Sequence, residues 1–284
     1  MGAQNGLRTV SESLAWARAA IGAVDARVLL CHVTGWNAAA LIARGDRALS
    51  APLAVRFEAL VARRQQGEPV AYLTGEREFY GRLFRVTPAV LIPRPETELL
   101  VELALGQRGA YRQPRVLDLG TGSGILAITL ALEWPESTVC AVDCARDALW
   151  VAMANAARLG ASVSFIESDW FANMGADRFD LILANPPYVA QNDAHLQAGD
   201  VRFEPQGALA SGPQGLDALG QIIADAPAFL EEGGWLMLEH GYDQAAAVRS
   251  RLVDAGFVDV ESWKDLAGTE RVSGGRRLRR EPLP

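Results

Sequence analysis

The segment Asn185-Pro186-Pro187-Tyr188 places an amide side chain, two prolines and an aromatic ring directly after the apolar run 179–184. Each proline holds φ at about −65° and lacks an N–H group, so the segment offers carbonyl acceptors and cannot continue a sheet ladder. The first proline also disfavours helical geometry at the residue before it, which holds Asn185 extended. If 179–184 is a strand, these groups lie at its carboxyl end, where open α/β sheets bind ligands.

A second segment that could do chemistry, residues 118–124, reads Asp-Leu-Gly-Thr-Gly-Ser-Gly. Its three glycines allow a sharp turn and let a ligand approach the backbone closely. The dinucleotide fingerprint GxGxxG would need glycine at the position of Ile125, so hydride transfer with NAD ranks last among the functions considered. Asp143, at the end of the run 138–142, stands where a carboxylate can accept both hydroxyls of a ribose, although an Asp there can also be a helix N-cap.

The order of these segments resembles class I S-adenosylmethionine-dependent methyltransferases, in which DxGxGxG follows the first strand and [DN]PP[YFW] follows the fourth. The resemblance implies S-adenosylmethionine as cofactor, with Asp118 near its ammonium group and Asp169 and Trp170 against its adenine. Trp170 can also be explained as core packing. The residues expected to hold the cofactor are Asp118, Gly120, Thr121, Gly122, Ser123, Gly124, Asp143, Asp169, Trp170 and Asn185.

The NPPY segment resembles that of methyltransferases acting on a nitrogen conjugated to a π-system, either adenine N6 or a glutamine amide. Such a nitrogen is a poor nucleophile because its lone pair is delocalised. If its N–H groups donate to the Asn185 side-chain oxygen and the Pro186 carbonyl, electron density returns to the nitrogen and its lone pair is aimed at the methyl group. Tyr188 can pack its face against the flat group. Asn185, Pro186 and Tyr188 are thus the predicted catalytic residues, and with Pro187 they form the predicted substrate-binding segment.

Further segments narrow the resemblance to the peptide chain release factor glutamine methyltransferases, the PrmC/HemK family. They are EPVAYLTG at 68–75, FYG at 79–81, VTPAVLIPRPETE at 86–98, NPPYV at 185–189, EP at 204–205, AL at 208–209 and LEHG at 238–241. The resemblance implies a helical substrate-recognition domain at 1–75, a β-hairpin linker at 76–95 and a Rossmann-like catalytic domain at 96–284. It also implies the substrate, which is the glutamine of the Gly-Gly-Gln motif in class 1 release factors, methylated on its side-chain nitrogen N5.

The first 90 residues are expected to form short helices followed by a β-hairpin. Thr9 and Glu12 form a capping box before a helix to residue 20, and further helices are expected at 25–33, after Gly35, and from a Ser50 cap to Gln66. Four short helices predict a small bundle. Residues 78–80 and 83–86 then predict a hairpin.

Beyond residue 90, Thr97 is expected to cap a helix to about residue 105, and from residue 115 strands and helices alternate. Strands are expected at 116–119, 138–142, 163–166, 179–184 and 234–239, and helices at 124–133, 145–159, 217–229 and 244–255. Continuous apolar strands separated by helices predict a parallel, doubly wound α/β sheet. Two late strands complete it, the tail 274–284 is expected to fray beyond its first residues, and the long loop 189–215 is expected to be functional or mobile.

Composition excludes several other classes of protein. The chain has 284 residues, of which 50% are hydrophobic, but no run of 18 apolar residues and no basic leader, so a membrane span or secretion is not expected. Three unpaired cysteines and three scattered histidines predict a cytoplasmic protein without a metal site. Of the net charge of −7, residues 1–90 carry +4 and residues 91–284 carry −11, which argues against direct nucleic-acid binding.

Two alternatives to a release factor methyltransferase are open from the residues alone. Adenine N6 methylation is compatible with NPPY, but the chain lacks a basic aromatic cleft. A non-enzymatic cofactor-binding scaffold is the other, although an intact NPPY speaks against it. The expected partners are class 1 release factors, and the expected state is a monomer. The stretch 93–97 resembles the segment with which amino-methyltransferases close over the methionine end of the cofactor, but an N-cap role for Thr97 and a surface ion pair for Arg94 are sufficient explanations.

Overall fold

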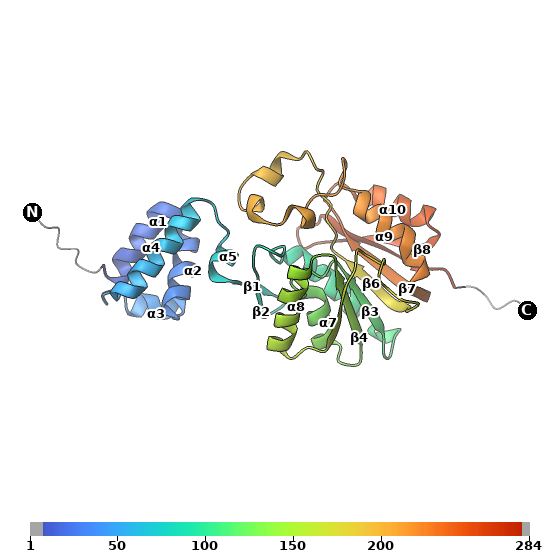
Figure 1. Cartoon of the computed structure of the whole chain (residues 1–284), viewed down its shortest axis with the longest axis horizontal. Coiled ribbons are helices and arrows are strands. Elements are labelled where there is room, and N and C mark those ends of the chain that lie inside the picture. Colours follow the sequence, from blue (N-terminus) through green and yellow to red (C-terminus); the bar gives the residue numbers. More distant parts are fainter. Residues whose placement is uncertain (1–7, 280–284) are drawn as a thin grey trace, which may run out of the picture. The chain divides into compact units, whose positions relative to one another are not determined.

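The computed structural model describes residues 8–279 and contains two compact units, Met1–Glu76 and Arg77–Pro284 (Figure 1). The helices of the first unit are α1 (Val10–Ile21), α2 (Ala23–Thr34), α3 (Ala38–Ala43), α4 (Ala51–Gln65) and α5 (Val70–Thr74). Helix α1 begins with the predicted capping box, because Thr9 Oγ1 accepts from the Glu12 N–H at 3.1 Å and Glu12 accepts from the Thr9 N–H at 2.8 Å. The helices bury a shared apolar cluster that includes Leu29, Leu30 and Phe57.

Two details of the first unit differ from the prediction. The sequence predicts four helices, whereas the described part of this unit has a fifth, α5, which follows Pro69 and ends at Gly75 in the left-handed conformation (φ +75°). The predicted cap at Ser50 makes no side-chain hydrogen bond to the start of α4.

A two-stranded hairpin, β1 (Glu76–Phe79) and β2 (Arg82–Arg85), confirms the predicted hairpin. A 3₁₀ turn at Pro95–Thr97 then leads into α6 (Glu98–Gly106). The predicted N-cap at Thr97 is wrong. Because Pro95 already begins the helical turn, Thr97 lies within it (φ −67°, ψ −18°) and makes no capping hydrogen bond. Its buried hydroxyl is therefore available for a contact elsewhere.

The second unit is built on a seven-stranded sheet with the order β5-β4-β3-β6-β7-β9-β8. Its strands are β3 (Arg115–Leu119), β4 (Thr138–Asp143), β5 (Val163–Glu167), β6 (Phe179–Ala184), β7 (Leu230–Glu239), β8 (Phe257–Lys264) and β9 (Glu270–Arg277). The first five strands in this order run parallel, and β9 is antiparallel to both of its neighbours. The predicted doubly wound α/β sheet is confirmed.

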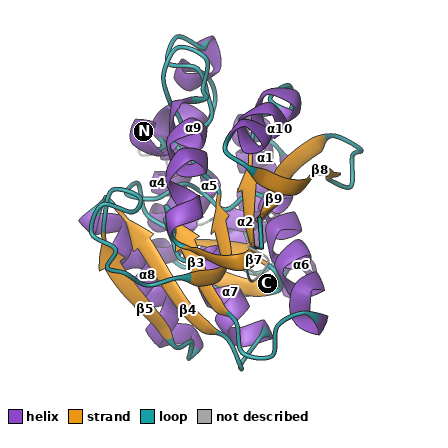
Figure 2. Cartoon of the chain, turned by 90° about the vertical axis from the view of Figure 1, so that its right-hand side faces the viewer, coloured by secondary structure: helices purple, strands orange, loops and turns teal. Residues whose placement is uncertain are grey.

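Helices cover both faces of the sheet (Figure 2). They are α6, α7 (Ile125–Glu133), α8 (Arg146–Leu159), α9 (Asp217–Asp225) and α10 (Ala245–Asp254). Successive side chains of a strand point to opposite faces. In β3, Val116 packs in the cluster with α6 and α7, and Leu117 packs in the cluster with α9 and α10. Burial on both faces explains why these strands are continuous apolar runs.

The carboxyl-terminal half differs from the prediction in two places. Helix α9 ends at Asp225 rather than 229, because Pro227 starts a 3₁₀ turn, and β7 therefore begins already at Leu230. The loop 189–215 contains three 3₁₀ turns. Strand β9 continues to Arg277 and so includes the first residues of the tail, while residues 280–284, on which the predicted fraying falls, lie outside the described range. No helix within residues 8–279 is long and apolar enough to span a membrane.

Candidate functional site

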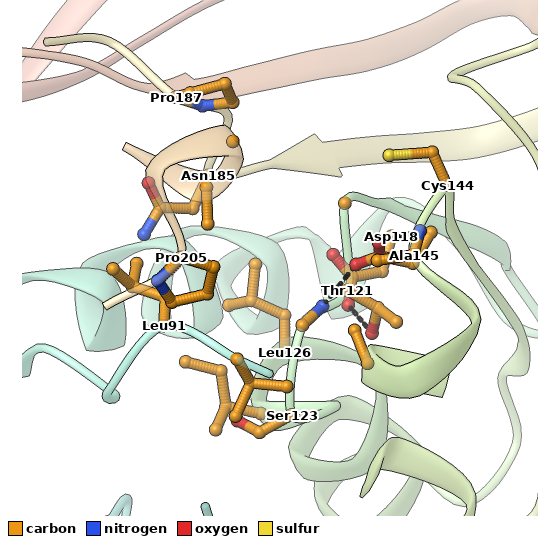
Figure 3. Close-up of a pocket in the computed structure, with 18 of the residues that line it drawn as sticks. Leu91, Asp118, Thr121, Ser123, Leu126, Cys144, Ala145, Asn185, Pro187 and Pro205 are labelled. Carbon is orange, nitrogen blue, oxygen red and sulfur yellow. Dashed lines mark hydrogen bonds between the residues drawn. The ribbon is translucent and has the colours of Figure 1, made fainter. Parts of the chain in front are cut away.

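A cavity of about 220 Å³ opens at the carboxyl ends of β4, β3 and β6, three neighbouring parallel strands. It is lined by Asp118, Gly120, Thr121, Gly122, Ser123, Asp143, Asp169, Trp170, Asn185 and Pro187 from the predicted site, together with residues of the segments 89–97 and 205–208. In Figure 3, Asn185 and Pro205 lie on one side of the cavity, and Asp118, Thr121 and Ala145 lie on the other. The strand order thus brings together residues far apart in the sequence.

The glycine loop between β3 and α7 runs close to the sheet. The N–H groups of Gly120 and Thr121 both donate to the Val142 carbonyl of β4 at 2.9 Å. Gly120, Gly122 and Gly124 all have positive φ, between +55° and +86°, which a side chain would disfavour. A Cβ atom on Gly124 would lie 2.6 Å from Ile128 and 3.2 Å from Ala152, so this glycine lets α7 and α8 pack closely rather than lining the cavity.

Asp118 is buried at the base of the loop. Its Oδ2 accepts hydrogen bonds from Thr121 Oγ1 at 2.7 Å and from the Ala127 N–H at 3.2 Å. Its Oδ1 is buried without a hydrogen-bond partner among the described residues, and burial raises the pKa of this carboxyl to about 7. A cationic group in the cavity would supply the missing partner. This orphaned oxygen therefore fits the ammonium group of S-adenosylmethionine.

Asp143 has a role in the fold as well as a place in the cavity. Its two carboxylate oxygens accept from the Gly122 N–H at 2.8 Å and the Ala145 N–H at 2.9 Å, and burial raises the pKa of the carboxyl. The N-cap-like contact and the ribose contact are compatible, because each carboxylate oxygen has a second lone pair.

Asp169 and Trp170 both line the cavity, and Trp170 also packs against the sheet core. Its backbone is in the left-handed region (φ +47°), and its ring lies 3.3 Å from where a Cβ on Gly120 would be. A bulky residue held in that conformation is typical of a functional site.

Asn185 lines the cavity directly after β6, and its Nδ2 donates a hydrogen bond to Thr97 Oγ1 at 3.0 Å. Pro186 is buried, and neither it nor Tyr188 is among the residues that line the cavity. Tyr188 instead donates to Oε1 of Glu239, the last residue of β7, at 3.3 Å. Burial and the nearby Glu239 carboxylate raise the pKa of Tyr188 well above its usual range, so its hydroxyl stays protonated.

Sequence reasoning missed the role of Glu204. Its side chain is fully buried, Oε2 accepts from the Ile92 N–H at 2.9 Å, and Oε1 pairs with the Arg94 guanidinium. The expected surface ion pair of Arg94 is therefore wrong, since its partner is inaccessible to solvent. The pair ties the loop 189–215 to the segment that lines the cavity opposite the glycine loop. Glu204-Pro205 and the Pro-flanked Arg94 are both part of the family resemblance, which could have indicated the contact.

Within residues 8–279 no group of three or more histidine, cysteine, aspartate or glutamate side chains could hold a metal ion. The groups that surround the cavity include three carboxylates, backbone N–H groups, hydroxyls, one thiol, one amide, apolar side chains and the Arg94 guanidinium, which is paired with Glu204. These are suited to a cationic, partly aromatic organic molecule rather than to a metal.

Two family models match the chain. One describes the PrmC N-terminal domain and matches residues 7–75, and the other describes the methyltransferase small domain and matches residues 95–207.

Relatives match most of the chain and most of their own length. A release factor glutamine methyltransferase of Burkholderia pseudomallei is 53% identical over 263 residues, covering 90% of this chain and 92% of that protein. One of Escherichia coli is 44% identical over 254 residues, covering 89% and 91%.

Solved structures share the fold at low sequence identity. A methyltransferase from Pyrococcus furiosus is 17% identical with a TM-score of 0.53, covering 76% of this chain and 97% of that one. The hMettl16 catalytic domain, in complex with a 3′UTR hairpin, is 16% identical with a TM-score of 0.56, covering 84% and 88%.

The fold and the site define an S-adenosylmethionine-dependent methyltransferase. Within that class, the chain belongs to the release factor glutamine methyltransferase family.

Proposed function

We propose that this chain transfers the methyl group of S-adenosylmethionine to the side-chain nitrogen N5 of the glutamine in the Gly-Gly-Gln motif of class 1 release factors. The observation that carries the proposal is the hydrogen bond from Nδ2 of Asn185 to Thr97. It uses the donor end of the amide, so Oδ1 remains as an acceptor beside the donor-free Pro186-Pro187 backbone. That arrangement suits a substrate with two N–H groups on one planar nitrogen.

The substrate nitrogen is activated by hydrogen bonding in this proposal. Oδ1 of Asn185 and the Pro186 carbonyl accept its two N–H groups, which fixes the nitrogen's orientation and returns electron density to it. Tyr188 is expected to contact the planar amide with its ring. The bond from its hydroxyl to Glu239 fixes the ring's position. No side chain needs to act as a strong base, because the nitrogen loses its proton only after it has become cationic.

When bound, S-adenosylmethionine supplies an electrophilic methyl group on a sulfonium. Asp118 is proposed to hold the ammonium group, because its buried Oδ1 has no partner among the described residues. Asp143 is proposed to accept the ribose hydroxyls, and Asp169 with Trp170 to hold the adenine. The backbone of Gly120, Thr121, Gly122 and Ser123 is proposed to border the amino-acid part, while Gly124 acts through packing.

The remaining expectations from the sequence stay part of the proposal. Residues 1–75 are proposed to recognise the release factor, and the enzyme is proposed to be a cytoplasmic monomer that does not bind nucleic acid directly. Adenine N6 methylation is not favoured, since the relatives that match nearly the whole chain are named for a glutamine reaction.

Asn185→Ala tests the mechanism. Cofactor affinity, measured by calorimetry, should stay within about threefold of wild type, and methyl transfer to a release factor should fall by about 100-fold or more. Leu266→Ala is a suitable control, because Leu266 is fully exposed in a turn of the sheet's last hairpin, and it should change neither quantity. Normal turnover in Asn185→Ala would refute the role of the amide.

A further inference from the structure

Three polar groups lie behind the cavity wall at Asn185. They are the hydroxyl of Thr97, which is 0% exposed, the carboxyl of Glu239, which is 1% exposed, and the hydroxyl of Tyr188. Thr97 accepts from Nδ2 of Asn185 at 3.0 Å, and Glu239 accepts from Tyr188 at 3.3 Å. Thr97 and Asn185 line the cavity, whereas Glu239 and Tyr188 do not. The set thus reaches from the sheet end to the cavity surface.

The Thr97 hydroxyl has a single hydrogen, and the carboxyl of Glu239 is an acceptor near it. A threonine hydroxyl donates once and accepts up to twice, and an ionised carboxylate can only accept. Oε2 of Glu239 is buried and has no partner at hydrogen-bonding geometry among residues 8–279. The Thr97 hydroxyl is nonetheless close enough to Glu239 to lower the pKa of that carboxyl. Turned toward Glu239, the hydroxyl hydrogen would give this unsatisfied buried oxygen a donor while Thr97 still accepts from Asn185.

This direction of donation determines which end of the Asn185 amide faces Thr97. With its hydrogen directed at Glu239, Thr97 offers only lone pairs to Asn185, and these bind the NH₂ end. An amide rotated by half a turn would place Oδ1 against the same lone pairs, which is repulsive. The rotated amide would also present N–H groups to a substrate that itself brings N–H groups. Only the observed orientation leaves an acceptor for that substrate.

We propose that Thr97 is a positioning residue for methyl transfer, and that its hydroxyl, directed by Glu239, holds the acceptor end of Asn185 in place for the substrate nitrogen. The role rests on the proposed function, because it concerns the amide that grips the substrate. It differs from a capping role, since Thr97 makes no hydrogen bond to the start of α6. It also differs from a cofactor contact, because its hydroxyl is engaged with protein groups.

Thr97→Val and Thr97→Ser test the role in the full-length enzyme. Valine keeps the shape of threonine and removes the hydroxyl, so the amide loses its directing partner. We expect kcat for methyl transfer to fall by about 10- to 100-fold, the range expected when a reacting group is misplaced by about an ångström. KM for the release factor and cofactor affinity should change by less than about threefold, because uniform binding is retained. Serine keeps the hydroxyl, and kcat should return to within about threefold of wild type.

Thr129→Val is the matched control. Thr129 lies in α7, is also 0% exposed, and its hydroxyl has no hydrogen-bond partner among the described residues. The same substitution there removes no positioning contact, and kcat should not change.

If Thr97→Val lowers kcat no more than Thr129→Val does, the positioning role is refuted while the proposed function stands. Equal loss in Thr97→Ser and Thr97→Val would likewise refute it, since the hydroxyl would then not be the cause. A wild-type chain that binds S-adenosylmethionine but methylates no release factor would refute the proposed function, and the positioning role with it.

Discussion

Arg94 and Glu204, 110 residues apart in the sequence, form an ion pair in which the glutamate side chain is completely buried. Glu204 also accepts from the Ile92 N–H, so one carboxylate fastens two parts of the segment 92–94 to the loop 189–215. Both segments line the cavity, through residues such as Pro93 and Pro205. The pair therefore closes one side of the cofactor site by linking two otherwise separate segments.

Removal of this carboxylate should loosen that side of the cavity. Glu204→Ala leaves the Arg94 charge and the Ile92 N–H without their buried partner, a change that costs about 3 kcal/mol. We expect the free energy of unfolding in urea to fall by that amount and cofactor affinity to weaken. Glu58→Ala is the control, since its ion pair with Arg8 is half exposed and should contribute less than about 1 kcal/mol. Equal effects of the two substitutions would contradict the closing role.

Asp118→Asn should raise the stability of the fold while it weakens cofactor binding. Burial raises the pKa of Asp118 from 3.8 to about 7, so the folded chain binds this proton more tightly than the unfolded chain does. Stability from this group is therefore present below the unfolded pKa and is lost as pH rises toward 7. Asparagine removes that loss, and at pH 8 the variant should be more stable than wild type by up to about 4 kcal/mol.

The same substitution removes the expected partner of the cofactor's ammonium group. Affinity for S-adenosylmethionine should fall by about 100-fold at pH 8, as measured by calorimetry. In urea unfolding, the stability gain should disappear below about pH 3, where the wild-type carboxyl is protonated in both states. If the variant is less stable than wild type at pH 8, the ionised buried carboxylate does not destabilise the fold, and the prediction is wrong.

The rate of methyl transfer should depend on the protonation of Glu239. Burial raises the pKa of this carboxyl to about 7, and the charged groups that act on it are Glu96, which raises the pKa, and Arg271, which lowers it. The hydrogen bond from Tyr188 and the nearby hydroxyl of Thr97 lower it as well. Below pH 7 the protonated carboxyl could itself donate to Thr97, which would then be free to bind Oδ1 of Asn185 instead of Nδ2.

We therefore expect kcat at saturating substrates to rise with pH through about 7. Glu239→Gln has no titrating group at this position, and the pH step should be absent from its profile even if its rate is lower throughout. Cofactor affinity, which is proposed to depend on Asp118, should keep its own pH dependence in Glu239→Gln. If wild type and Glu239→Gln show the same pH step in kcat, a group other than Glu239 causes the step.

The glycines of the loop 120–124 should tolerate alanine to different degrees. At Gly124 a Cβ atom would lie 2.6 Å from Ile128 and 3.2 Å from Ala152, in addition to the strain at φ +86°. Gly122 has a φ of +55° but nothing within 4 Å of such an atom. Gly122→Ala should cost about 1–2 kcal/mol from the backbone alone, and Gly124→Ala clearly more because α7 and α8 must move apart. Thermal or urea unfolding measures both, and the reverse order would contradict the packing role of Gly124.

Much of the second unit is predictable because its signals are local. The run 179–184 is apolar throughout because β6 is buried on both faces, and the glycine loop interrupts the pattern where the chain must turn. Such patterns depend on a few neighbouring residues. They locate the strands, the first helix with its capping box, and the residues at the carboxyl ends of the strands.

The errors at the site itself concern contacts between distant segments. Thr97 precedes a helix and looks like its cap, but its hydroxyl is used by Asn185, 88 residues away. Arg94 looks like a surface residue because nothing nearby in the sequence shows that Glu204 is buried beside it. Position 124 requires glycine partly because α8, a later helix, packs closely against it. Sequence patterns identify the residue types at this site, whereas the hydrogen-bond partners that orient them require the fold.

The central claim is methyl transfer to the glutamine of the Gly-Gly-Gln motif, and its most direct measurement uses purified release factor and labelled S-adenosylmethionine. Wild-type release factor and a variant with that glutamine replaced should be compared, with the labelled residue located by mass spectrometry of the digested protein. The predicted result is label on the side-chain nitrogen of that glutamine in the wild-type factor and no label in the variant. Label that persists after the glutamine is replaced, or its absence from both factors, would contradict the proposed function.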